Sequence, residues 1–229
     1  MSDIHGRYDK FTQMLRHINF SKIDKLYILG DVIDRGEEPI LLLNEIMEKD
    51  NIHLLMGNHE YMMINALMHN VYIDTWVYNG GYTTLDKFLE LNEKDKQDIL
   101  EYLYHLPVII PSLTVNGQCF YLSHSAPPDI KLEKTEYMYT LKESLLNSAL
   151  WERVDLNVHL PLFSTLYPER ILLSGHTIVS HYSDSPLENH IFHSKDGIFI
   201  DIDCGCARFD DNIARLGCLR LDDMKEFYT

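Results

Sequence analysis

Short apolar runs that end in polar residues recur along this chain. The runs are Leu26–Leu29, Leu54–Met56, Phe120–Leu122 and Ile171–Leu173, and a histidine or a carboxylate follows each within three residues. Short apolar runs bounded by glycine and polar residues are typical of buried strands. The chain also opens on Ser2–Gly6, which has the same character as the polar segments after these runs. Ligands of open α/β sheets lie at the carboxyl ends of strands, so we expect five such ends to converge.

Amphipathic segments separate the first strands. Apolar residues at helical spacing predict a helix over Tyr8–Ile18, and Pro39 lies near the start of a second helix that runs to Lys49. A third helix is predicted over Glu60–Met68, after the strand His53–Met56. With a strand over Lys25–Leu29, this alternation of strands and helices predicts parallel strands joined by crossover helices.

A helical insert follows, at about residues 70–106. Asn79–Gly81 predicts a turn, and the apolar spacing predicts helices over Thr83–Leu91 and Glu93–Leu106. Such an insert either shapes access to the site or covers a face of the sheet, and the pattern leaves both open.

The second half begins with a predicted hairpin. Asn116–Gly117 separates the runs Val108–Val115 and Gln118–Leu122, which favours a tight turn and antiparallel strands. A helix over Thr140–Trp151 and further strands complete the chain, the strands being Ile171–Leu173, Ile191–His193, Ile198–Ile202 and Leu216–Leu221. The prediction is an α/β (α+β) fold in a single domain, residues 1–229, with two mixed β-sheets packed as a sandwich and flanked by helices.

Composition narrows the classes of partner. The net charge of -15 argues against nucleic acid or an anionic membrane as a partner, yet an anionic substrate remains possible because bound cations reverse the local charge. No run is long enough for a membrane span and no secretory signal is evident, so a cytoplasmic location is the default expectation. The pair Cys204 and Cys206 is interpreted as small residues on a buried strand rather than a redox or zinc motif.

The residues at the strand ends form a set of oxygen and nitrogen donors. They are Asp3, His5, Asp31, Asn58, His124 and His176. With one shared carboxylate, this set suits two divalent ions, manganese first and iron or zinc as alternatives, rather than one structural zinc. Two such ions about 3.5 to 4 Å apart activate a hydroxide for in-line attack on phosphorus. Phosphoester hydrolysis is therefore the predicted reaction.

Other polar residues then take roles in that reaction. His59 is the predicted proton donor to the leaving oxygen, and Asp34 orients its ring. Arg35 is suited to bind the phosphate oxygens, with Arg153 as a second contact. The remaining histidines are interpreted as surface or core residues, and His181 is the strongest exception because it follows His176 closely.

Three motifs carry a family resemblance. Ser2–Gly6, Gly30–Gly36 and Gly57–Glu60 resemble the signature motifs of the phosphoprotein phosphatase family within the calcineurin-like metallophosphoesterases, and His124 and His176 match its later histidines. The resemblance is greatest to the bacterial and bacteriophage lambda-type serine/threonine phosphatases. It implies one metal held by Asp3, His5, Asp31 and His176, and a second held by Asp31, Asn58 and His124. It further implies an acid pair of Asp34 with His59, and substrate contacts from Arg35, Arg153 and Asn58.

The resemblance leaves the substrate open. A phosphorylated protein or peptide, with phosphoserine and phosphothreonine as targets, is the first expectation, and dinucleoside polyphosphates such as diadenosine tetraphosphate are the alternative. An inactive metal-binding protein is disfavoured because no ligand or acid is missing. The family also has a strand before its first motif, where this chain begins with Met1, so we expect the natural protein to extend upstream.

Overall fold

Strands and helices alternate at the start of the chain, as the apolar pattern predicts. The computed structural model describes residues 1–71, 73–182, 189–208, 210 and 213–229. The first elements are α1 (Tyr8–His17), β1 (Leu26–Ile28), α2 (Pro39–Met47), β2 (Ile52–Leu54) and α3 (Asn58–His69). β1 and β2 pair in parallel with α2 as the connection, which confirms the predicted crossover.

A six-stranded mixed sheet forms the centre of the second half. Its strands lie in the order β5-β3-β4-β6-β8-β7. They are β3 (Pro107–Val115), β4 (Gln118–Ser123), β5 (Glu136–Tyr137), β6 (Arg170–Ser174), β7 (Phe192–His193) and β8 (Phe199–Asp201). The predicted hairpin joins β3 to β4, with φ of 48° at Asn116 and 86° at Gly117.

The expectation that the second half is antiparallel is wrong for the middle of this sheet. β4 pairs with β6 in parallel, and β6 pairs with β8 in parallel. The reason is the long connection between β4 and β6, which contains α7 (Glu143–Trp151) and α8 (His159–Leu166). It returns the chain to the end of the sheet where β4 began, so that β6 runs in the same direction as β4. The sequence pattern had indicated α7 but not α8.

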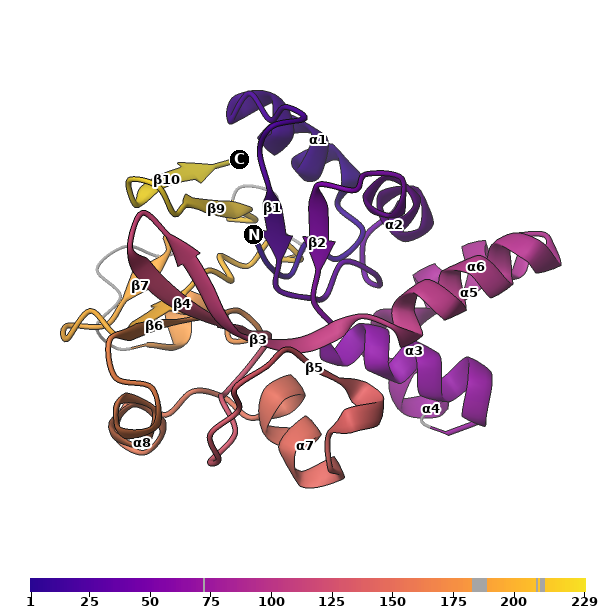
Figure 1. Ribbon diagram of the computed structural model, residues 1–229. Helices are drawn as coiled ribbons and strands as arrows, with labels where there is room; N and C mark the ends of the chain where they lie inside the picture. The colour runs from indigo at the N-terminus through magenta and orange to yellow at the C-terminus, as the bar shows by residue number, and fades with distance from the viewer. Residues whose placement is uncertain (72, 183–188, 209, 211–212) are drawn as a thin grey trace.

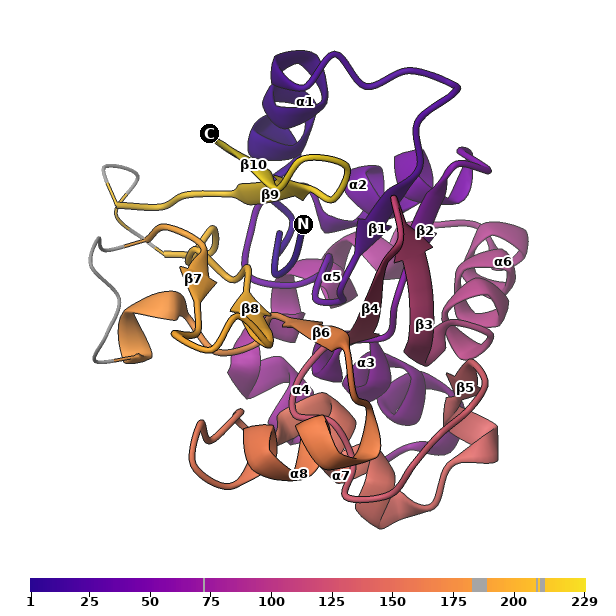
Figure 2. The ribbon, with the colours of Figure 1, turned by 60° about the vertical axis from the view of Figure 1, so that its left-hand side comes forward.

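Two smaller strand pairs face the six-stranded sheet. β9 (Gly217–Arg220) and β10 (Lys225–Tyr228) form an antiparallel hairpin, which lies with β1 and β2 on one side of the large sheet (Figures 1 and 2). Phe120 and Leu122 of β4 pack in the apolar cluster that also contains Leu29 and Leu55, at the ends of β1 and β2. Because alternate residues of a strand point to the same face, Phe120 and Leu122 together fill the space between the sheets.

The opposite face of the large sheet is covered by helices. Tyr121 of β4 meets Phe163 of α8 and Tyr167, with ring centroids 5.4 and 4.9 Å apart. The fold prediction, a mixed α/β sandwich flanked by helices, is confirmed. No helix in the described ranges is long and apolar enough to cross a membrane. Cys204 and Cys206 are buried and free, as predicted, but they lie after the end of β8 and not on a strand.

The predicted insert is helical and lies beside α3 (Figure 1). It contains α4 (Ile73–Trp76), a π-helical turn η1 (Val77–Gly81), α5 (Tyr82–Leu89) and α6 (Glu93–Tyr104), and residue 72 lies outside the described residues. The predicted turn at Asn79–Gly81 is instead part of η1, which is broken where Gly80 has φ of 103°. Two short 3-10 turns, η2 (Met138–Thr140) and η3 (Val179–His181), occur later in the chain.

Candidate active site

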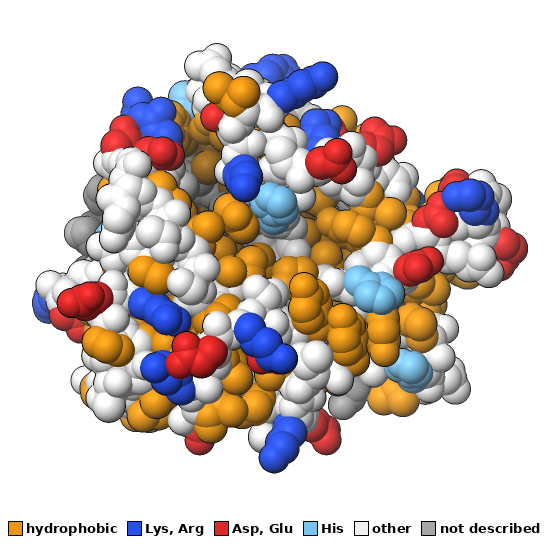
Figure 3. Space-filling model, viewed as in Figure 1, with side chains coloured by type: hydrophobic (Ala, Val, Ile, Leu, Met, Phe, Trp, Pro, Cys, Tyr) orange, Lys and Arg blue, Asp and Glu red, His pale blue; other side chains and the backbone are white. Residues whose placement is uncertain are grey.

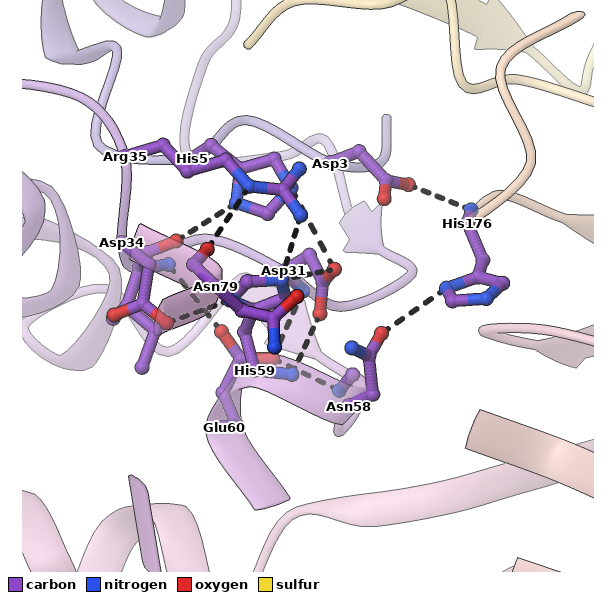
Figure 4. Close-up of polar contacts among 12 residues, drawn as sticks. Asp3, His5, Asp31, Asp34, Arg35, Asn58, His59, Glu60, Asn79 and His176 are labelled. Atoms are coloured by element: carbon purple, nitrogen blue, oxygen red, sulfur yellow. Dashed lines mark hydrogen bonds and ion pairs between the residues drawn. The ribbon is translucent and has the colours of Figure 1, made fainter. Parts of the chain in front are cut away.

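The polar residues after the strands converge at one edge of the sandwich. Among the residues that the structure describes, two groups could hold a metal ion: His5, Asp31 and His59 form one, and Asp31, His124 and His176 form the other. Within each group the ligand atoms lie within 4.8 Å of one another, and Asp31 belongs to both. Figure 4 shows most of these side chains directed toward a common space, with Asp31 near its centre.

Each of three histidines donates one ring proton to a backbone carbonyl. His5 Nδ1 donates to Ile33 O at 2.9 Å, and His124 Nδ1 donates to Leu29 O at 2.6 Å. His176 uses the other nitrogen, because its Nε2 donates to Trp151 O at 3.1 Å. The second nitrogen of each ring therefore carries a lone pair, and it faces the shared space.

Two of these histidines, His5 and His176, are in a protonation state that can bind a metal. Burial, reinforced by the charge of Arg35, lowers the pKa of His5 well below its usual value. Burial also lowers the pKa of His176 to about 3. Both rings are thus neutral at neutral pH, which is the form that ligates metal ions.

The contacts of Asn58 test whether a cation fits here. Its Oδ1 lies 2.9 Å from His124 Nε2 and 3.0 Å from His176 Nδ1. In a neutral ring whose proton faces a backbone carbonyl, the other nitrogen directs a lone pair toward the Asn58 oxygen. Asp31 adds two further oxygens, with Oδ2 3.6 Å from His5 Nε2 and Oδ1 3.5 Å from His124 Nε2. Converging lone pairs of this kind fit divalent cations.

Asp3 joins the first polar loop to the loop after β6. Its Oδ2 accepts the backbone N–H of His176 at 2.9 Å (Figure 4). The same oxygen accepts a short hydrogen bond from Ser2 Oγ. The carboxylate also lines the cleft. The structure therefore brings all six predicted metal ligands to the same edge, and their assignment to two ions remains a prediction.

The loops that carry these residues have unusual backbone conformations. Positive φ, which non-glycine residues rarely adopt, occurs at six of the predicted site residues: Asp3, His5, Asp31, Asp34, Arg35 and His176. Glu60 holds the loop after β1, because its Oε2 accepts the N–H of Asp31 at 2.8 Å and its Oε1 accepts that of Val32 at 2.9 Å. Strain of this kind persists only where surrounding contacts hold it, and it concentrates at functional sites.

His59 and Asp34 form a buried pair. His59 Nδ1 donates to Asp34 Oδ2 at 2.6 Å, and both side chains are almost fully buried. Burial by itself would lower the pKa of His59, but the charge of Asp31 and the hydrogen bond to Asp34 outweigh it, so that the pKa is raised. The Arg35 guanidinium spans His5 and His59, at 2.7 Å from His5 Nε2 and 2.9 Å from His59 Nε2.

The site opens into a cleft of about 1040 Å³. Arg153 and His181 are both exposed and line this cleft. The role of Arg153 as a substrate contact stays a prediction. Asp203 also lines the cleft and is buried, and the sequence interpretation missed this residue. The signal was available, because Asp203 lies three residues after the apolar run Ile198–Ile200, as the other site residues lie within three residues of theirs. Two other side chains at the site, Trp76 and Thr84, had no such signal.

Comparison with known proteins identifies the family of this chain. The model of the calcineurin-like phosphoesterase family matches residues 1–189. The chain belongs to this family. The resemblance drawn from the motifs is thereby confirmed, and the family agrees with the convergence of acidic and imidazole groups at the cleft.

Proteins similar in sequence to this chain are named for different activities. Serine/threonine-protein phosphatase 2 of Escherichia coli (strain K12) is 31% identical over 155 residues, which cover 66% of this chain and 65% of that protein. The symmetrical bis(5'-nucleosyl)-tetraphosphatase of Delftia acidovorans is 28% identical over 127 residues, covering 55% of this chain and 42% of that protein. The matched part is thus less than two thirds of either relative.

Solved structures agree on the fold. A metallophosphoesterase from Sphaerobacter thermophilus has a TM-score of 0.58 at 17% identity, covering 100% of this chain and 85% of that chain. The cold-active protein-tyrosine phosphatase of a Shewanella species has a TM-score of 0.60 at 17% identity, covering 100% and 78%. At these identities the likeness shows the fold alone.

Proposed function

We propose that this protein is a metal-dependent phosphomonoesterase that removes phosphate from phosphoserine and phosphothreonine in proteins. The observation that carries the proposal is the placement of the Asp34–His59 pair and the Arg35 guanidinium beside the converging ligand atoms. A phosphoester needs a cation for its equatorial oxygens and a proton for its leaving oxygen, and these groups supply both.

Two divalent ions would be held by the residues at the strand ends. Asp3, His5, Asp31 and His176 would hold one, and Asp31, Asn58 and His124 the other. When bound, such ions polarise the phosphoryl group and acidify water at neutral pH. Manganese is the metal we propose, with iron or zinc as alternatives, because the donors are imidazole, carboxylate and amide without thiolate.

The side chains of this protein then have separate tasks. Arg35 binds the phosphate oxygens, and it can reach them because its guanidinium already spans the space between His5 and His59. His59 Nε2 faces this space, while its Nδ1 is committed to Asp34. A proton on Nε2 therefore passes to the leaving oxygen as the ester bond breaks. Arg153, on the rim of the cleft, and Asn58 are proposed as further substrate contacts.

The open cleft supports a protein substrate, because a phosphorylated side chain must enter together with its peptide backbone. On the face shown in Figure 3, acidic and basic side chains are interspersed, so a single basic tract for nucleic acid is not evident there. A second candidate is hydrolysis of dinucleoside polyphosphates. It is favoured by the tetraphosphatase relatives and by Tyr78 at the cleft, a residue that is 92% exposed and has an aromatic ring suited to stacking on a base.

Steady-state kinetics with manganese test this proposal. We expect kcat/KM for a phosphoserine peptide to exceed that for diadenosine tetraphosphate by at least ~10-fold, a difference of about 1.4 kcal/mol in transition-state stabilisation. Inorganic phosphate is the expected product, and a chelator should abolish it. Preferred release of nucleotides from diadenosine tetraphosphate would favour the second candidate. No hydrolysis of either substrate or of 4-nitrophenyl phosphate, with two manganese ions bound by elemental analysis, would contradict both.

A further inference from the structure

The carboxylate of Asp34 has more partners than its pairing with His59 requires. Trp76 Nε1 donates to Asp34 Oδ2 at 2.8 Å, and Thr84 Oγ1 donates to Oδ1 at 2.5 Å. The backbone N–H of Asp34 in turn donates to Thr84 Oγ1 at 2.9 Å. Asp34, Trp76 and Thr84 all have 0% of their surface exposed. Both carboxylate oxygens are therefore held by donors that lie out of contact with water.

Both donors come from the helical insert. Trp76 is the last residue of α4 and Thr84 lies on α5, so that they lie 42 and 50 residues after Asp34 in the chain. The π-helical turn η1 between them lets the two side chains face the same carboxylate. Gly81 is required here, because a Cβ at this position would lie 2.5 Å from Trp76 Nε1 and 2.6 Å from its Cδ1.

The same turn contacts Arg35. The backbone N–H of Arg35 donates to Gly80 O at 3.1 Å, and its Nε donates to Asn79 O at 3.4 Å. The segment from Trp76 to Thr84 therefore holds two consecutive residues of the loop after β1. Asp34 is the partner of the proposed proton donor, and Arg35 is the proposed phosphate contact. A helix that merely covered a sheet face would not need these polar contacts.

Physical chemistry gives these contacts a specific consequence. Burying an ionised carboxylate away from water destabilises the folded protein unless the carboxylate oxygens accept hydrogen bonds. Trp76 and His59 share Oδ2, while Thr84 holds Oδ1, so the carboxylate plane cannot rotate away from the imidazole. A carboxylate that is held in place in this way fixes the tautomer and the orientation of the histidine bonded to it.

We propose that Trp76 and Thr84 are positioning residues for the proton donor, which act by holding Asp34 so that His59 Nδ1 keeps its proton and Nε2 faces the leaving oxygen. The insert thereby sets how well the enzyme hydrolyses esters with poor leaving groups. This inference rests on the proposed phosphomonoesterase function.

The first test compares two leaving groups. A phosphoserine peptide needs protonation of its alkoxide, whereas 4-nitrophenyl phosphate has an activated leaving group that needs little. Trp76→Phe and Thr84→Val should lower kcat for the peptide by about 10-fold and for 4-nitrophenyl phosphate by less than about 3-fold, with KM unchanged. Thr84→Ser restores the hydroxyl and should recover most of the peptide activity. Thr165→Val, at an exposed position of α8, is the matched control.

A double-mutant cycle separates positioning from general destabilisation. In a His59→Asn background, Trp76→Phe should cause no further loss of peptide turnover, because the group it positions is absent. Equal losses for both substrates, or an undiminished effect of Trp76→Phe in that background, would overturn the inference.

A spectroscopic test does not depend on the substrate. At a pH where its ring is neutral, His59 in ¹⁵N-labelled protein should show a single tautomer with the proton on Nδ1, the nitrogen that faces Asp34. The acid form, which donates to the leaving oxygen, carries a second proton on Nε2. Trp76→Phe combined with Thr84→Val should convert the single neutral tautomer to a mixture of tautomers. An unchanged tautomer in a folded double variant would reject the positioning role even if diadenosine tetraphosphate proved to be the substrate. Failure of the proposed function alone would leave the tautomer shift intact.

Discussion

Asp34 and Asp201 are both carboxylates with 0% exposed surface, yet their surroundings differ. Asp34 accepts from Trp76, Thr84 and His59. Asp201, at the end of β8, accepts one backbone N–H from Asp203 at 2.9 Å and a long contact of 3.4 Å from the Tyr182 hydroxyl. Burial, together with the nearby Asp203 carboxylate, raises the pKa of Asp201 well above its usual range.

The difference shows that donors, rather than depth of burial, decide what a buried carboxylate can do. Charge-stabilising hydrogen bonds let Asp34 serve as a fixed partner for His59, whereas Asp201 gains most by remaining protonated. Glu60 belongs with Asp34, because its buried oxygens accept four backbone N–H groups, those of Asp31, Val32, Ile33 and Gly57. The three carboxylates allow the comparison to be tested by removing charge while keeping shape.

The largest effect is expected for Asp34→Asn. An amide nitrogen facing His59 Nδ1 would favour the opposite tautomer, with the proton already on Nε2 and no charge to stabilise the imidazolium. We expect kcat for a phosphoserine peptide to fall by about 10² to 10⁴-fold. The manganese content, measured by elemental analysis, should not change. Wild-type turnover by this variant would show that the pair has no role in proton transfer.

Glu60→Gln should have a smaller effect, on metal binding rather than on proton transfer. One end of the amide presents N–H groups to backbone N–H groups, so the loop that carries Asp31 loses its support. We expect the affinity for manganese, measured by calorimetry, to fall by about 10-fold or more. Glu48→Gln, at an exposed position, is the control. Equal affinities in both variants would indicate that the loop keeps its conformation without the Glu60 charge.

Asp201→Asn should stabilise the folded protein at high pH, whereas the two preceding variants should each lose a property of the wild type. For an acid whose pKa is raised in the folded state, the folded protein binds more protons than the unfolded one, so stability falls as pH rises from the unfolded pKa toward the folded one. The amide in this variant is uncharged, like the protonated carboxyl of Asp201, so the variant should not lose stability as the pH rises. We expect Tm at pH 8 to rise by about 2 to 4 °C per kcal/mol recovered, with a smaller change at pH 5. Asp129→Asn, at an exposed position, should shift Tm at neither pH. A lower Tm at pH 8 would mean that Asp201 is charged and paired.

The smallest effect is expected for the thiols near Asp203. Burial, followed by the charge of Asp203, raises the pKa of Cys204, and burial raises the pKa of Cys206 to about 12. Neither thiol should therefore react with a thiol reagent in the folded protein at pH 8. Cys119, which is only partly buried, is the internal reference. Mass spectrometry of the labelled protein checks this, and rapid labelling of Cys204 would point to an open C-terminal region.

The elements that the sequence predicted best are those with local causes. The helices α1, α2 and α6 follow from apolar spacing, and the β3–β4 turn follows from Asn116 and Gly117, whose positive φ the residue types favour. The parallel pairing of β4 with β6 was missed because strand direction depends on what connects the strands. The connection there includes α8, whose short apolar segment had no clear period.

The sequence alone predicted the donor set, because Asp31, Asn58, His124 and His176 each lie within three residues of an apolar run. The strands before these residues belong to two sheets, with β1 and β2 in one and β4 and β6 in the other. The tertiary structure decided how those donors are held. The histidine tautomers depend on the carbonyls of Leu29, Ile33 and Trp151, and the Asp34 carboxylate depends on Trp76 and Thr84. Most of these partners are tens of residues distant, and hydrogen bonds between such segments exist only once packing has excluded water from around them.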